Sequence, residues 1–176
     1  MNQDILTDII AHKRKELVTQ EAVVSMSLLE SHIGDITAKY SMKQSLLSSS
    51  TGIIAEFKRR SPSKGWINQE ADVSVIPHNY EQAGAAALSI LTDEMFFGGS
   101  LKDIRIARPT VNLPILRKDF IIDEYQLLQA CIVGADAVLL IAACLSPEQC
   151  STLTAQAHEL GLEVLLEIHS GTLLYK

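Results

Sequence analysis

The sequence predicts an α/β fold of the (β/α)8-barrel type, incomplete here, with about five βα strands after an N-terminal helical extension. From Gly52 onward, short continuous apolar runs alternate with amphipathic segments of helical periodicity. Strands of this kind are typical of a parallel sheet that is buried on both faces. Gly84, Gly134 and Gly161 stand where three of the helices should end, and glycine is preferred just after a helix C-terminus.

The expected strands cover residues 52–57, 86–91, 114–117, 137–141 and 163–168. The expected helices cover residues 71–83, 101–107, 124–133 and 147–160. Each helix follows one strand and precedes the next, so the sheet is expected to grow by βα repetition.

Two parallel architectures fit this alternation, an open doubly wound sheet and a closed barrel. An open sheet often carries a glycine-rich phosphate loop after its first strand, and the sequence has neither GxGxxG nor a Walker pattern. Charged residues instead end several strands: Glu56 and Lys58 the first, Lys118 the third and Glu167 the fifth. Catalytic groups drawn from the ends of different strands are typical of a barrel, which is therefore favoured.

Two regions are expected, an N-terminal helical extension over residues 1–50 and the first five barrel strands over residues 51–176, with the C-terminal part missing. In the extension, apolar residues share one helical face and charged residues, Lys13 among them, occupy the rest. The serine-rich segment at residues 45–52 is interpreted as a polar boundary before the first strand.

A complete barrel has eight βα units in ~250 residues, whereas this sequence supplies five strands. We therefore expect a truncated gene product or a fragment. An incomplete barrel has two open strand edges that could pair with a second copy, so self-association is expected and a noncatalytic half-barrel is one alternative function.

Composition indicates a globular protein whose partner is a small molecule. The 176 residues are 47% hydrophobic and carry a net charge of −6, with a mean hydropathy of +0.17 and a pI near 5.3. The acidic balance argues against nucleic acid or an anionic membrane as the main partner. The sequence shows no secretory signal, no apolar run of ~20 residues and no CxxC spacing among its cysteines, so reduced thiols and a cytoplasmic location are expected.

Five segments at strand ends form one ordered series. They read IAEFKRRSPSKG at residues 54–65, ALSILTDEMFFGGS at 87–100, PILRKDFI at 114–121, DAVLLI at 136–141 and EVLLEIH at 163–169. This series resembles indole-3-glycerol phosphate synthase, an enzyme family of tryptophan biosynthesis. The resemblance spans most of residues 52–169, so chance or a merely shared fold explains it poorly.

The resemblance implies ring closure of 1-(2-carboxyphenylamino)-1-deoxyribulose 5-phosphate, a phosphorylated small molecule, with loss of carbon dioxide and water. It implies no cofactor and no metal. Lys118 matches the general acid, and Glu167 matches a carboxylate that takes the proton lost when water leaves. Lys58 matches a cation that holds the substrate carboxylate, and Glu56 a partner that positions the ammonium groups. The order of acid and base roles stays open.

The resemblance also implies an apolar slot for the anthranilate ring, lined by Phe97, Phe120 and Leu139. Ser61 and Pro62 match residues of the first loop that close over the substrate. Barrel phosphate sites lie in the loops after strands 7 and 8, which are not found here, so we expect the isolated chain to be impaired. Another phosphate-sugar barrel enzyme, such as an isomerase, is a second alternative, although it would not need all four charged residues.

Glu167 provides a test of the strand register. It follows a run of apolar residues that a parallel sheet would bury on both faces, where a carboxylate is costly unless it faces a polar opening. We therefore expect Glu167 to point into the open end of the barrel, near Lys118 and Lys58.

Overall fold

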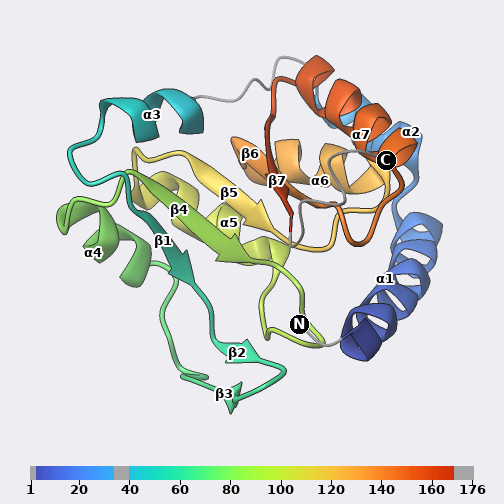
Figure 1. Cartoon of the computed structure of the whole chain (residues 1–176), viewed down its shortest axis with the longest axis horizontal. Coiled ribbons are helices and arrows are strands. Elements are labelled where there is room, and N and C mark those ends of the chain that lie inside the picture. Colours follow the sequence, from blue (N-terminus) through green and yellow to red (C-terminus); the bar gives the residue numbers. More distant parts are fainter. Residues whose placement is uncertain (1–2, 34–39, 169–176) are drawn as a thin grey trace.

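Five parallel strands form the centre of the protein in the computed structural model, which describes residues 3–33 and 40–168. Their order in the sheet follows their order in the chain, with every neighbouring pair parallel (Figure 1). The strands are β1 (Ile54–Phe57), β4 (Ala87–Leu91), β5 (Ile115–Lys118), β6 (Ala137–Ile141) and β7 (Glu163–Glu167). Sequential order in a parallel sheet is the arrangement of a (β/α)8 barrel, so the predicted fold class is confirmed.

Helices connect these strands and cover the outer face of the sheet. Asp123 and Ser146 each form a capping box at a helix start, and Gly134 ends a helix with a φ of 89°. The connecting elements are α4 (Ile76–Gln82), α5 (Leu101–Ala107), the short η1 (Arg108–Thr110), α6 (Glu124–Val133) and α7 (Pro147–Glu159). The local sequence signals for caps therefore account for most helix boundaries.

One predicted helix is five residues too long at its start. The expected helix at 71–83 begins only at Ile76, whereas the other strand and helix bounds agree within two residues. Asp72 accepts hydrogen bonds from the backbone N–H and the hydroxyl of Ser74, and Arg59 donates to the carbonyl of Ala71. These bonds favour a turn over a helix, because a short polar side chain competes for the backbone donors.

Side chains alternate between two apolar layers along the central strands β4, β5 and β6. Leu88, Ile90, Ile115, Val138 and Leu140 point outward into the cluster shared with α5, α6 and α7. A second cluster fills the inner face and includes Ala87, Leu116, Ala137, Leu139 and Ile141. Because successive residues of a strand face opposite sides, β4, β5 and β6 each contribute to both clusters.

The three N-terminal helices pack around this sheet. They are α1 (Gln3–Val23), α2 (Met26–Ile33) and α3 (Met42–Ser48). Met42 of α3 and Ile9 of α1 both enter the inner apolar cluster. In Figure 1, α3 lies near the N-terminal ends of the strands and α1 near their C-terminal ends, so the inner face is covered from both sides.

Two expectations about the extension are wrong. Residues 45–48 belong to α3 and are not a polar boundary. Ser41 caps this helix at its start, and the hydroxyl of Ser45 donates to the carbonyl of Ala86 at 2.6 Å, so the segment is part of the packed structure. Lys13 is not on a solvated face but is 1% exposed. Three carboxylates, from Glu16, Asp93 and Asp119, surround its ammonium group.

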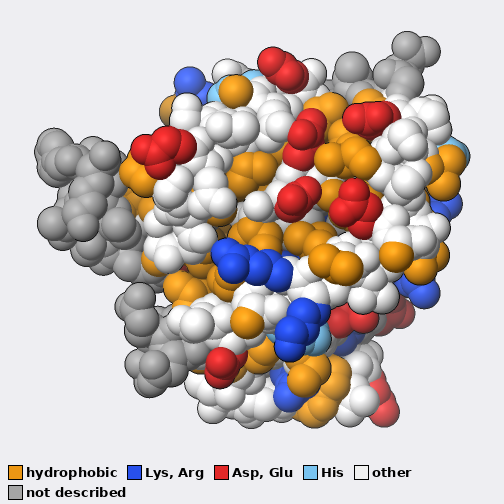
Figure 2. Space-filling model, turned by 90° about the vertical axis from the view of Figure 1, so that its right-hand side faces the viewer, with side chains coloured by type: hydrophobic (Ala, Val, Ile, Leu, Met, Phe, Trp, Pro, Cys, Tyr) orange, Lys and Arg blue, Asp and Glu red, His pale blue; other side chains and the backbone are white. Residues whose placement is uncertain are grey.

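The surface and the sheet edges are the remaining features of the described residues. Seen from the side, the surface mixes acidic, basic and apolar side chains (Figure 2).

β1 and β7 are the edge strands of the described sheet, and Leu165 and Leu166 of β7 are exposed. No helix in the described ranges is long and apolar enough to cross a bilayer.

Asp136, just before β6, ties the N-terminal ends of the strands together. One of its carboxylate oxygens accepts from Arg108 at 2.7 Å and from the N–H of Ile115 at 2.9 Å, and the other accepts from the N–H of Tyr40 at 3.1 Å. The Arg108 guanidinium also lies 4.7 Å from the centre of the Tyr40 ring. These contacts join the start of β5, the start of β6 and the segment before α3.

We expect Asp136→Ala to lower the free energy of unfolding by ~3–5 kcal/mol, because it removes the acceptor of Nη1 of the largely buried Arg108 and of the Ile115 N–H. Urea denaturation followed by circular dichroism measures this. The exposed Glu70→Ala is the control and should change stability by no more than ~0.5 kcal/mol. A loss below ~1 kcal/mol for Asp136→Ala would contradict the assignment.

Candidate active site

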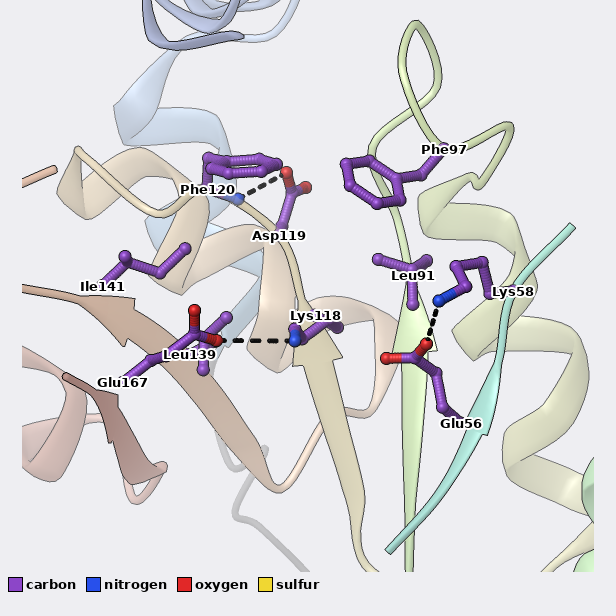
Figure 3. Close-up of a pocket in the computed structure, with 10 residues that line it drawn as sticks. All are labelled: Glu56, Lys58, Leu91, Phe97, Lys118, Asp119, Phe120, Leu139, Ile141 and Glu167. Carbon is purple, nitrogen blue, oxygen red and sulfur yellow. Dashed lines mark hydrogen bonds and ion pairs between the residues drawn. The ribbon is translucent and has the colours of Figure 1, made fainter. Parts of the chain in front are cut away.

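The inward-facing residues at the C-terminal ends of the strands surround one cavity. In the register of the sheet, Leu91 lies opposite Lys118, and Ile141 lies opposite Glu167. The cavity has a volume of about 110 Å³, on the order of the ~150 Å³ apolar cavity that accepts a benzene ring. Its lining consists of Glu56, Lys58, Leu91, Phe97, Lys118, Asp119, Phe120, Leu139, Ile141 and Glu167 (Figure 3).

Two ion pairs face this cavity from different strands. Lys118 Nζ lies 3.6 Å from Glu167 Oε2, and Lys58 Nζ lies 2.6 Å from Glu56 Oε1. The four side chains are between 29% and 35% exposed. Pairs at this exposure contribute little to stability, since water screens them, but their charged atoms stay accessible to a ligand.

Phe97 and Phe120 form the apolar end of the cavity. Their ring centres are 6.0 Å apart, with the ring planes inclined by 39°. Figure 3 shows both rings on one side of the cavity, with the Lys118–Glu167 and Lys58–Glu56 pairs beyond them. The site therefore combines an aromatic end with an end that carries two ammonium groups and two carboxylates.

The loop after β4 places Phe97 through close backbone packing. A Cβ on Gly99 would lie 2.1 Å from the carbonyl oxygen of Leu91, so any side chain there would push the loop away from the strand. Asp93 caps the same loop by accepting from the N–H groups of Phe96 at 2.8 Å and Phe97 at 3.2 Å. The position of the Phe97 ring thus depends on one glycine and one buried carboxylate.

Asp119 has a corresponding role beside Phe120. Its Oδ1 accepts from the Phe120 N–H at 2.8 Å, and its Oδ2 accepts from the Thr92 hydroxyl at 2.7 Å and from Arg117 at 3.1 Å. Burial alone would raise the pKa of Asp119, but the charges of Arg117 and Lys13 outweigh burial and lower this pKa to about 2. Asp119 is therefore ionised at neutral pH despite its burial.

The structure brings together seven of the nine site residues expected from the sequence: Glu56, Lys58, Phe97, Lys118, Phe120, Leu139 and Glu167. Glu167 points toward Lys118, as its place in the strand predicted. Ser61 and Pro62 are not in the cavity lining. They belong to a small hairpin in which β2 (Arg60–Ser61) pairs with β3 (Gly65–Trp66), and their part in closing the site stays a prediction.

Sequence reasoning missed three residues of the lining: Leu91, Asp119 and Ile141. Leu91 and Ile141 each end a strand on the inward side, so the period of two that selects Leu139 could have found them. No comparable signal marks Asp119. It directly follows Lys118, and only its contacts show why it lies here.

The candidate chemistry is that of proton transfer. Ammonium groups donate protons and carboxylates accept them, and the Lys118–Glu167 pair places one of each at a common opening. In the described ranges, no cluster of three or more histidine, cysteine, aspartate or glutamate residues could hold a metal ion. The expectation that no cofactor is needed stays a prediction.

The fold and the site together define a β/α-barrel protein with acidic and basic side chains at the C-terminal ends of its strands. The sequence pattern of the indole-3-glycerol phosphate synthase family matches residues 6–175. The chain therefore belongs to the indole-3-glycerol phosphate synthase family.

Individual relatives in several bacteria carry the same family name. The protein named indole-3-glycerol phosphate synthase in Bacteroides thetaiotaomicron is 67% identical over 169 residues, covering 96% of this chain and 65% of the relative. That of Neisseria meningitidis serogroup B is 48% identical, covering 98% and 68%, and that of Rhodopirellula baltica is 48% identical, covering 94% and 64%. The chain thus spans about two thirds of the length of these relatives.

The lowered pKa of Asp119 predicts loss of stability in acid. An unfolded aspartate takes up its proton near pH ~3.9, whereas folded Asp119 does so only near pH 2. Between these values the unfolded chain binds more protons than the folded chain. The contribution of Asp119 to the free energy of unfolding is therefore complete above pH ~4, and it falls by at most ~1.4 kcal/mol per pH unit as the pH falls toward 2.

Urea denaturation between pH 2.5 and 5 tests this contribution. We expect Asp119→Asn to show a shallower decline of stability with falling pH than the parent chain, whatever its absolute stability. Glu70→Gln removes an exposed carboxylate and serves as the reference for charge removal. Equal slopes for Asp119→Asn and the parent would show that Asp119 does not titrate in this way.

Proposed function

We propose that this site catalyses the ring closure of 1-(2-carboxyphenylamino)-1-deoxyribulose 5-phosphate to indole-3-glycerol phosphate, with release of carbon dioxide and water. The observation that carries the proposal is the Lys118–Glu167 pair, which adjoins an aromatic slot at the mouth of the barrel. The names of the relatives support the same reaction. An assay in solution follows the formation of indole-3-glycerol phosphate by its fluorescence.

The first step needs a proton donor beside the ketone. The ring carbon that carries the carboxylate attacks the ketone carbon, and carbon dioxide leaves from that ring carbon as aromaticity returns. Lys118 donates a proton to the developing alkoxide, which is the charge that the step creates. Phe97 and Phe120, whose rings contact each other, form an apolar wall against which the aromatic ring packs, so the reacting carbons meet with little loss of entropy.

The second step removes water and completes the pyrrole ring. Lys58 donates a proton to the hydroxyl formed in the first step, which leaves as water, and Lys58 regains a proton from solvent. A proton leaves the adjacent carbon to form the double bond. Glu167 accepts that proton. Its carboxylate lies 3.6 Å from Lys118 Nζ, so a small movement lets the two groups exchange a proton and restore their starting states.

Lys58 and Glu56 bind and orient in this proposal. Lys58 attracts the substrate carboxylate until carbon dioxide is released and then assists departure of the hydroxyl. Glu56 holds the Lys58 ammonium 2.6 Å away and keeps it at the cavity wall while the site is empty. Leu139 supplies apolar surface beneath the ring.

Lys118→Met should reduce kcat by ~10²–10⁴-fold while KM changes only a few-fold, because a proton donor acts mainly in the transition state. The chain spans 65% of the Bacteroides relative, so the assay uses the chain alone and the chain fused to the residues of that relative beyond the aligned region. Lys102→Met removes an exposed lysine of α5 and is the control. A kcat within ~3-fold of the parent, with only KM raised, would refute the role of Lys118.

Lys58→Met should raise KM and lower kcat together, because this cation is proposed to bind the carboxylate and to assist loss of water. Steady-state kinetics of the fused enzyme measure both constants. Glu56→Gln keeps the size of the side chain that pairs with Lys58 and should have a smaller effect on KM and on kcat. A change confined to KM would limit Lys58 to binding.

Three further properties are proposed alongside the reaction. Residues 1–50 form a helical extension and residues 51–176 the barrel strands. The activity is placed in the cytoplasm, where the free thiols of Cys131, Cys144 and Cys150 stay reduced. Self-association through the edges of β1 and β7 is tested by light scattering of the purified chain.

A further inference from the structure

Lys13 is a buried cation that the proposed reaction does not use. It lies on α1, is 1% exposed and does not line the cavity. Its ammonium nitrogen is 3.2 Å from Asp93 Oδ2, 3.1 Å from Asp119 Oδ1 and 2.9 Å from Glu16 Oε2. Asp93 follows β4 and Asp119 follows β5, so one side chain of α1 joins two loops at the mouth of the barrel.

The same two carboxylates hold the two aromatic residues of the slot. Asp93 accepts from the N–H of Phe97 at 3.2 Å, and Asp119 accepts from the N–H of Phe120 at 2.8 Å. Each phenylalanine is therefore one hydrogen bond away from a carboxylate that Lys13 contacts. The spacing between the rings depends on how far apart these carboxylates lie.

Among the buried groups of this cluster, the charges balance only when Lys13 is present. Lys13 and Arg117 are the cations, and Asp93 and Asp119 are the fully buried anions, with Glu16 at the partly exposed rim. Without Lys13, two buried carboxylates would share one guanidinium that contacts Asp119. Like charges repel strongly in a poorly hydrated interior, so the two loops would move apart.

We propose that Lys13 is a positioning residue that sets the placement of the contacting Phe97 and Phe120 rings, and thereby the fit of the slot that they wall on one side to a single planar aromatic ring. The identity of that ring rests on the proposed function, whereas the positioning itself does not. α1 thus takes part in substrate recognition from outside the cavity. Lys13 acts through Asp93 and Asp119 and touches no reacting atom.

Lys118, although it lies between Arg117 and Asp119 in the chain, is also held by the sheet itself. Its backbone pairs with Leu91 in the sheet, and its carbonyl accepts from the N–H of Thr92 at 3.1 Å. Loss of Lys13 should therefore disturb the ring slot more than the proton donor. This difference separates a positioning role from general damage to the site.

The first experiment compares Lys13→Met with Lys15→Met, which removes the same charge from an exposed position of the same helix. In the 176-residue chain, amide hydrogen exchange of Phe97 and Phe120 should be at least about tenfold faster in Lys13→Met, with that of Leu88 in β4 unchanged. Lys15→Met should match the parent at all three amides. Unchanged exchange at Phe97 and Phe120 in folded Lys13→Met would overturn the proposal.

The kinetic readout uses the fused enzyme. Lys13→Met should raise KM about tenfold and keep kcat within about threefold, because the ring is held less well while Lys118 stays in place. A roughly tenfold loss in kcat with an unchanged KM would contradict the proposal. If the parent fused enzyme has no synthase activity, the proposed function fails, and the exchange experiment still decides the role of Lys13.

A double variant keeps the test valid if Lys13→Met does not fold. Lys13→Met combined with Asp93→Asn removes one cation and one anion, so Arg117 again balances Asp119. We expect this variant to fold, with exchange at Phe97 and Phe120 close to that of Asp93→Asn alone, because an asparagine oxygen still accepts from the Phe97 N–H and the two side chains no longer repel. Failure to fold, or exchange at both amides about tenfold faster than in Asp93→Asn, would show that Lys13 does not act through this charge balance.

Discussion

The alternation of side chains along parallel strands is the constraint on which the rest of the structure depends. In the three central strands, β4, β5 and β6, which are buried on both faces, one row of side chains faces the helices and another faces the interior. The interior row of β5 runs from Leu116 to Lys118, and that of β6 from Ala137 through Leu139 to Ile141. In these two strands the interior row carries its polar side chain, Lys118, at the strand end, where it reaches the cavity. The candidate site therefore follows from the packing of the sheet.

A second level of organisation lies just outside the cavity, in buried charges. Arg117 faces outward from β5, opposite to Lys118, and contacts Asp119, Gln129 and the carbonyl of Gln126. The strand end thus carries an accessible lysine inside and a buried ion network outside. Such a network holds its loops in one arrangement, because a displaced member would leave an unpaired charge in a poorly hydrated region.

The two ends of the inner face differ in the kind of contact that closes them. At the N-terminal ends, Asp136 and Arg108 join backbone groups of adjacent strands, and α3 packs Met42 into the apolar interior. At the C-terminal ends, α1 combines apolar contact through Ile9 with the ion pairs of Lys13. Barrel proteins commonly separate a stabilising end from a functional end, and this chain shows that division within five strands.

The sequence by itself determined the fold class, the bounds of the five sheet strands and of the helices between them apart from the start of α4, and the charged strand-end residues. These features depend on local periodicity and on caps, which a short window of residues contains. It did not determine the environment of Lys13. Lys13 stands four residues after Ile9 and so shares its helical face, yet the carboxylates that neutralise it come from residues 93 and 119. Only the tertiary structure brings such distant residues together, because their contact depends on how α1 packs across two loops.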